Sequence, residues 1–179
     1  IHFAFFAPLM LKTVKHECTI VIAAPTQNQA GIMYDRIRSL IMNNEFLKGY
    51  VVRNTQTELW VNFLDNTGMS KIITRATGEH GTTLRGYSPH CIIADECSFI
   101  KTNILKAFLP SGMATQARVW LTSTPFSKSG YFYEACQNSK LKKSDGLWTE
   151  FHVKSTDNPL IQEDPTFIEE IKRLTKEEY

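Results

Sequence analysis

The sequence contains few cysteines and no C-x-x-C pair. The four cysteines are scattered along the chain, at Cys18, Cys91, Cys97 and Cys136. Three of them lie in or beside apolar runs, and free cysteine is among the most buried residue types, so the pattern indicates reduced, buried thiols in an intracellular protein. A zinc site is disfavoured because adjacent His90 and Cys91 would point to opposite faces of a strand.

An excess of charge of one sign is also missing. The 20 Lys and Arg residues oppose 18 Asp and Glu residues, and a formal net charge of +2 does not by itself indicate a polyanionic partner. No apolar run is long enough to span a bilayer, and the opening IHFAFFAPLMLK lacks the basic start and cleavage site of a secretory signal. With 42% apolar and 21% charged residues, the 179 residues have the composition of one ordinary globular domain.

A phosphate-binding loop of the form G-x-x-x-x-G-K-[ST] is the most informative absence. In such a loop the backbone N–H groups surround the phosphates and the lysine contacts the β and γ groups. Among the 9 glycines only Gly81 and Gly86 have the required separation, and Tyr87 stands where the lysine would be. We interpret this pair as a chance match, so the chain contains no Walker A loop.

Strands and helices alternate along the chain. The unbroken run TIVIAA at residues 19–24 is typical of a strand buried on both faces, and the apolar spacing of residues 27–42 predicts an amphipathic helix. Further strands are predicted at residues 50–53, 58–64, 71–77, 91–95, 119–122 and 149–154, and further helices at 103–108, 130–140 and 164–179. The alternation predicts an α/β fold with a mainly parallel sheet flanked by helices and a short antiparallel or mixed insertion around residues 50–77.

Polar residues follow three of the buried strands. In chain order they are Thr26, Asp95, Glu96, Thr122, Ser123 and Thr124. The carboxyl ends of parallel strands meet at one edge of a sheet, where α/β proteins bind ligands. An aspartate there binds Mg²⁺, a neighbouring glutamate orients and deprotonates an attacking water, and hydroxyls on the next strand bond the γ-phosphate.

Each of these features alone has a plainer explanation. An acidic pair after a strand often complements the dipole of a following helix, and a Thr-Ser-Thr-Pro run is often a capped turn. Their order and separation along the chain favour the functional interpretation. We therefore predict that Asp95 binds a metal and that Glu96 is a catalytic carboxylate.

With these strand ends identified, the chain resembles the ATPase motor domain of the large terminase subunit of tailed bacteriophages and related viruses. The matching stretches are TIVIAAPTQNQAGIMYDRIRSLI, TTLRGYSPHCIIADE, VWLTSTPFSKSGYFYEA and STDNPLIQEDPTFIEEIKRLTKEEY. They cover well over half the chain in the order found in that family. The resemblance implies a P-loop NTPase fold of the additional-strand class, with ATP and Mg²⁺ as cofactors.

The resemblance also assigns roles to residues. Asp95 matches the Walker B residue that holds Mg²⁺, and Glu96 matches the catalytic carboxylate. The coupling motif that senses the γ-phosphate matches Thr122, Ser123 and Thr124. Arg85, in the Leu-Arg-Gly element, and Thr26 are candidate contacts to phosphate or DNA, although a solvated loop arginine is an equally good interpretation of Arg85.

The implied activity is ATP hydrolysis coupled to translocation of DNA into a capsid. The partners expected from the resemblance are double-stranded DNA, the portal protein, the small terminase subunit and further copies of the chain on the portal. No membrane partner is expected, and the expected location is the cytoplasm of the host cell.

The chain departs from the family at both ends. The adenine-contacting segment and Walker A loop would precede IHFAFFAPLMLK, and the nuclease domain would follow KEEY. We therefore expect residues 1–179 to form a single ATPase-core domain that is incomplete at its N-terminus and inactive alone, with a terminal helix at 164–179 leading toward a nuclease domain.

Two alternatives stay open at this point. A DEAD-box-type helicase, or another P-loop motor, shares the Ala-Pro-Thr strand end and the acid pair, but its Walker B motif continues Asp-Glu-x-Asp/His and its coupling motif reads Ser-Ala-Thr. Here Asp95 and Glu96 are followed by Cys97 and Ser98, and the coupling stretch reads Thr-Ser-Thr-Pro. The other alternative is an interaction domain that has kept the sheet and lost nucleotide binding.

Overall fold

The structure, a computed structural model, describes residues 17–63, 67–84, 86–140 and 148–154, together with 166, 168–170 and 173. The chain divides into two compact units, Ile1–Ala135 and Cys136–Tyr179. The first unit contains the whole sheet. That residues 1–179 form one ATPase-core domain stays a prediction.

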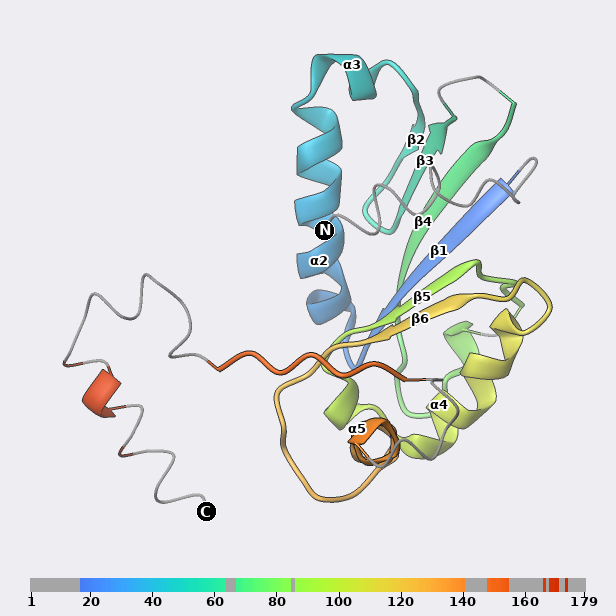
Figure 1. Cartoon of the computed structure of the whole chain (residues 1–179). Helices are drawn as coiled ribbons and strands as arrows, with labels where there is room; N and C mark the ends of the chain where they lie inside the picture. Colours follow the sequence, from blue (N-terminus) through green and yellow to red (C-terminus); the bar gives the residue numbers. More distant parts are fainter. Residues whose placement is uncertain are drawn as a thin grey trace. The chain divides into compact units, whose positions relative to one another are not determined.

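Six strands form one sheet in the order β2-β3-β4-β1-β5-β6 (Figure 1). Their bounds are β1 Glu17–Ala24, β2 Val51–Asn54, β3 Glu58–Asn62, β4 Met69–Ala76, β5 Cys91–Ala94 and β6 Arg118–Leu121. Strand β1 is parallel to both β4 and β5, and β5 is parallel to β6. Strands β2 and β3 pair antiparallel, as do β3 and β4. The predicted insertion is thus the edge of the main sheet, joined to it through β4.

Strand β1 is the most buried element of the sheet. After Glu17 every residue of the strand is buried, as the run TIVIAA predicts. Its alternate side chains enter two different clusters, with Ile20 and Ile22 on one face and Val21 and Ala23 on the other. The two halves of the core therefore meet at this strand.

Helix α2, Gln27–Met42, covers one face of the sheet (Figure 1). Its buried residues, Ala30, Tyr34, Ile37 and Ile41, recur at intervals of three and four, which is the spacing of one helix face. The hydroxyl of Tyr34 also donates a hydrogen bond of 2.7 Å to the backbone oxygen of Thr55. The helix predicted over residues 27–42 is confirmed.

The other face is covered by short helices. They are α4 Thr102–Phe108, the 3-10 turns η1 Thr82–Leu84, η2 Cys97–Phe99 and η3 Leu109–Gly112, and the beginning of α5 Tyr131–Lys140. Ile104, Leu105 and Phe108 of α4 pack against Val21 and Ile92 of the sheet. A four-residue helix, α3 Glu45–Lys48, follows α2. The strands predicted between residues 50 and 122 and the helices predicted at 103–108 and 130–140 are confirmed to within a few residues.

Buried thiols are a feature of both clusters. Burial raises the pKa of Cys18 to about 12 and that of Cys91 to about 11, so both stay protonated and unreactive at neutral pH. Cys91 packs in the cluster under α2, whereas Cys97 packs in the cluster on the opposite face.

One predicted strand is wrong. Residues 149–154 have no regular secondary structure, and Phe151 and Val153 are 79% and 78% exposed. Two apolar residues in alternation predict a strand only where a neighbouring strand is available to bury them. The predicted helix start at Asp164 and Pro165 lies outside the described residues, while the described residues 166, 168–170 and 173 are helical.

We expect Ile20→Ala in β1 to lower the free energy of unfolding by about 2–5 kcal/mol, because the side chain is fully buried and a cavity would remain. The matched control is Ile32→Ala on the outer side of α2, where the side chain is 58% exposed and the expected change is below about 0.5 kcal/mol. Urea unfolding of the two variants measures the difference. Equal effects would contradict the assignment of β1 to the core.

Candidate functional site at the carboxyl edge of the sheet

The site is built where three neighbouring parallel strands end. Strands β1, β5 and β6 are adjacent and parallel, so their carboxyl ends lie at the same edge. The backbone pairing continues one residue past β5 and β6: the N–H of Asp95 donates to the oxygen of Ala23 at 2.8 Å, and the N–H of Thr122 donates to the oxygen of Ala94 at 2.9 Å. Asp95 and Thr122 are thereby placed side by side by the sheet itself.

Two hydroxyls face two carboxylates at this edge. Thr122 Oγ1 donates a 2.7 Å hydrogen bond to Asp95 Oδ1, and Ser123 Oγ donates a longer one of 3.5 Å to Glu96 Oε2. Both carboxylates are partly exposed. The structure therefore brings together four of the residues selected from the sequence, in matching order on two strand ends.

Glu96 has an unusual backbone. Its φ and ψ are 50° and 44°, in the left-handed region that non-glycine residues seldom occupy. The conformation is enforced by its surroundings, since the following N–H of Cys97 donates to Thr122 O at 3.0 Å and the N–H of Phe99 donates to Glu96 O at 3.0 Å. Backbone strain of this kind persists where the surrounding structure fixes it, and it concentrates at functional sites.

The chemistry of the edge fits a magnesium ion only in part. Carboxylate oxygens are the ligands that Mg²⁺ prefers, and the ion is usually held by one or two carboxylates together with waters and substrate phosphates. Within the described residues there is no group of three or more His, Cys, Asp or Glu side chains that could hold a metal ion. A cation at Asp95 would therefore depend on phosphate oxygens and water to complete its coordination.

Thr26 has a structural role at the end of β1. It is the N-cap of α2: its Oγ1 accepts a hydrogen bond from Gln29 N at 3.3 Å and donates one to Gln29 Oε1 at 2.9 Å. The Thr-Gln-Asn-Gln order is a variant of the capping box. A contact between Thr26 and phosphate or DNA stays a prediction, and Arg85 lies outside the described residues.

Gly81, the first glycine of the pair with the spacing of a phosphate loop, has a structural explanation. Gly81 has a φ of +63°, and a Cβ there would come within 2.7 Å of Ile104 Cγ2. The glycine is needed so that the chain after β4 can pass close to α4. This supports its interpretation as a chance match.

Ser98 is a site residue that the sequence did not single out. Its backbone N–H donates to Ser123 Oγ at 3.1 Å, and its hydroxyl donates to the backbone oxygen of Thr124 at 3.0 Å. The one feature of the sequence that could have indicated Ser98 is its position, two residues after the acid pair. A serine in a turn is too common for that position to be selected without the structure.

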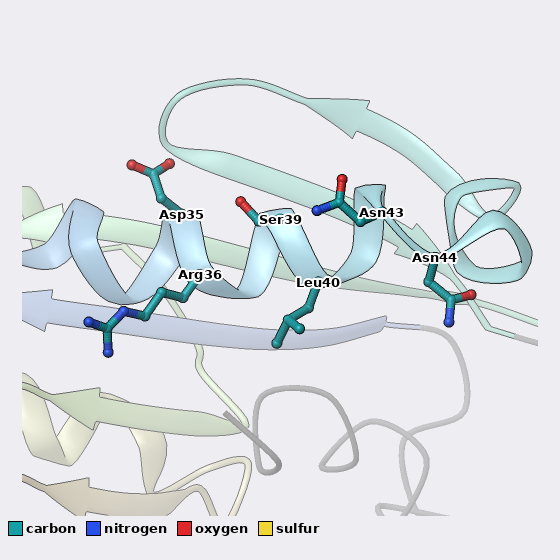
Figure 2. A pocket seen from close by; sticks show the side chains of 6 residues that line it. All are labelled: Asp35, Arg36, Ser39, Leu40, Asn43 and Asn44. Carbon is teal, nitrogen blue, oxygen red and sulfur yellow. The ribbon is translucent and has the colours of Figure 1, made fainter. Parts of the chain in front are cut away.

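A separate hollow lies on α2 and has no connection with this chemistry. Figure 2 shows its lining residues, Asp35, Arg36, Ser39, Leu40, Asn43 and Asn44, all from the second half of α2 and the residues after it. The helix starts directly after β1, so its first residues lie at the carboxyl edge and its last residues lie away from it. The hollow is open to solvent, and it does not contain any of the residues selected from the sequence.

The fold and the edge together define an α/β domain of the P-loop NTPase type. A family model described as the N-terminal part of the terminase large subunit, T4likevirus-type, matches residues 2–179. The chain belongs to this family, and the resemblance noted in the sequence is confirmed. A search of curated proteins finds no match.

Solved structures of phage terminases share the fold. The ATPase domain of the Thermus phage P74-26 large terminase is 21% identical, with a TM-score of 0.59 over 74% of this chain and 55% of that one. The HK97 bacteriophage large terminase is 16% identical, with a TM-score of 0.61 over 78% and 29%. The large terminase of a thermophilic bacteriophage, in complex with ADP, is 12% identical, with a TM-score of 0.61 over 80% and 35%.

At these identities the likeness establishes the fold, and it confirms the predicted fold class. The chain spans between 29% and 55% of the length of these three relatives. None of the described helices is both long and apolar enough to cross a membrane. The family favours a terminase over the helicase alternative.

We expect the free energy of unfolding of Glu96→Gly to be about 1 kcal/mol higher than that of Glu96→Gln, because glycine adopts the left-handed backbone at this position without strain. Lys106 is a matched control, since it is exposed within α4 and glycine in a helix should be less stable than glutamine by about 0.5–1 kcal/mol. Urea unfolding of the four variants measures both differences. A Glu96→Gly variant that is no more stable than Glu96→Gln would show that the backbone is not strained.

Proposed function

We propose that this chain is the ATPase core of a viral or prophage large terminase subunit, in which ATP hydrolysis drives double-stranded DNA into a capsid. The observation that carries the proposal is the pairing of Asp95 and Glu96 with hydroxyls of Thr122 and Ser123 at one edge of the sheet. In a terminase fold, that edge is where a carboxylate pair and a γ-phosphate sensor belong together. The ADP in the structure of the thermophilic bacteriophage terminase supports a nucleotide as the ligand.

Asp95 and Glu96 have different tasks in this proposal. Asp95 has one oxygen occupied by the Thr122 hydroxyl, which orients the carboxylate and leaves its second oxygen for a magnesium ion. The ion, when bound with ATP, supplies charge neutralisation of the phosphates. Glu96 holds the attacking water and accepts its proton, and the strained backbone keeps the carboxylate of Glu96 beside Ser123.

The coupling segment, defined as Thr122, Ser123 and Thr124, links the state of the nucleotide to movement. The hydroxyls of Thr122 and Ser123 already donate hydrogen bonds to Asp95 and Glu96. A change in how these hydroxyls contact the γ-phosphate would therefore change the hydrogen bonds of both carboxylates. Loss of a γ-phosphate contact is a common trigger of conformational change. We therefore assign γ-phosphate sensing to this segment.

The phosphate loop must come from outside the described strands. Strand β6 pairs with β5 and is the last strand in the order of the described sheet. A further parallel strand at that edge would bring its carboxyl end next to Thr122, which is the correct place for a loop that wraps the phosphates. We propose that this strand and its Walker A loop precede the 179 residues in the complete protein.

The remaining partners follow from membership of the family. We propose that the complete protein binds double-stranded DNA, works with the portal protein and the small terminase subunit, and assembles as several copies on the portal in the host cytoplasm. The terminal helix predicted at residues 164–179 would then lead toward a nuclease domain.

In the full-length protein, Glu96→Gln should lower the kcat of ATP hydrolysis by at least about 100-fold, because the amide cannot accept the proton of the water. ATP affinity should change by less than about 3-fold, since the glutamine keeps the size of the side chain. Glu134→Gln, at an exposed glutamate of α5, is the matched control and should retain wild-type turnover. Steady-state hydrolysis and nucleotide binding measure the two effects, and turnover of Glu96→Gln within a few-fold of wild type would refute the assigned base.

The 179 residues alone should bind ATP weakly and turn over none, because no lysine in a glycine-rich loop contacts the phosphates. The measurement is phosphate release by the purified chain over many equivalents of ATP. Multiple turnover that disappears in the Glu96→Gln variant would contradict this expectation and would place the phosphate site within these residues.

A further inference from the structure

Ser98 lies between the acid pair and the exposed aromatic residue Phe99. It belongs to η2 and is partly buried. It is outside the acid pair and outside the coupling segment, yet it makes one hydrogen bond with its backbone and another with its side chain, both to that segment. Ser98 therefore connects the acidic turn, defined as residues 95–99, to the coupling segment.

The backbone of Ser98 determines how the Ser123 hydroxyl is oriented. A serine hydroxyl has a single proton to donate and lone pairs that accept. Ser98 N–H donates to Ser123 Oγ at 3.1 Å and so occupies a lone pair, while the proton of the same hydroxyl is directed to Glu96 Oε2 at 3.5 Å. The hydrogen-bond chain starts at Ser98 and ends on the carboxylate of Glu96.

The side chain of Ser98 fixes the next residue of the segment. Its hydroxyl donates to Thr124 O at 3.0 Å, directly before Pro125. Two further contacts of the same turn lie on either side: Cys97 N–H donates to Thr122 O at 3.0 Å, and the Phe99 and Phe126 rings lie 4.7 Å apart between centroids. The two phenylalanines are 47% and 69% exposed, so they hold each other at the surface and do not belong to the core.

These contacts connect Cys97, Ser98 and Phe99 to the stretch of residues 122–126 that follows β6. Displacement of the coupling segment therefore cannot occur without either breaking the Ser98 bonds or moving the turn that carries Glu96. The hydroxyl of Ser98 bonds the backbone of the segment directly, so it can be removed without altering any side chain of the segment itself.

We propose that Ser98 is a positioning residue that fastens the coupling segment to the acidic turn, so that the segment and Glu96 move as one unit during the ATPase cycle. This inference rests on the proposed function, because it concerns the same site. Ser98 acts on catalysis through Glu96 and Thr124, and it does not contribute to the affinity for ATP.

The test uses Ser98→Ala in the full-length protein. Removing one neutral hydrogen bond that positions the segment should lower kcat by about 3- to 10-fold, and the KM for ATP should stay within about twofold of wild type. Ser98→Thr keeps the hydroxyl and should restore most of the lost kcat. Thermal unfolding of each variant verifies that the fold is intact.

The matched control is Ser127→Ala, a few residues further along the same loop. The Ser127 hydroxyl bonds only within its own loop, donating to Ser129 O at 3.2 Å among the described contacts, and it does not reach the acidic turn. Its kcat and KM should equal those of wild type. Should Ser98→Ala fail to fold, Phe126→Ala removes another fastening of the same segment at an exposed position, and it should also lower kcat without a change in KM.

The outcomes separate this inference from the function on which it rests. Wild-type kcat in Ser98→Ala, together with inactivity of Glu96→Gln, overturns the role of Ser98 and leaves the ATPase assignment intact. A kcat loss that Ser98→Thr does not restore, or one accompanied by an equal rise in KM, also overturns it, because both indicate disturbed packing. If Glu96→Gln itself retains turnover, it is the proposed function that fails.

Discussion

The fold depends on the parallel pairing of β1 with both of its neighbours. Eight residues of β1 pair with β4 and four with β5, and every residue after the first is buried. Since residues 18–24 are buried, their backbone N–H and C=O groups must be paired, and a shift of one residue would exchange the two faces of the core. The register of β1 therefore fixes where β5 ends, and with it the position of the acid pair.

The two faces of the sheet make different contributions to the site. The face under α2 is a continuous apolar layer, and α2 begins at the carboxyl edge with a capped first turn. The opposite face is covered by short helices and turns, among them η2, which directly follows Glu96. The rigid layer holds the strands in place, while the side built from short elements carries the residues that the proposed cycle would move.

The sequence predicts the strands and helices around the sheet well, because β-branched runs and apolar spacing report burial directly. It also selects the strand ends that carry Asp95 and Thr122, since parallel strands must end at a common edge. It does not predict the partners of those side chains: the bond from Thr122 to Asp95 depends on β6 lying next to β5, which no local pattern encodes. The left-handed backbone of Glu96 and the role of Ser98 were missed for the same reason, because neighbours far along the chain impose them. The alternation of apolar residues at 149–154 predicts a strand that the structure does not contain, because a strand pattern does not specify a partner strand.

The burial of three cysteines has a consequence for anyone labelling this protein with thiol reagents. Cys18 and Cys91 lie in the cluster under α2, and Cys97 lies in the cluster on the opposite face. Since a reagent needs an accessible thiolate, it would reach these sulfur atoms only when the packing around them opens. The rate of labelling at each position would therefore report how often each face of the sheet opens.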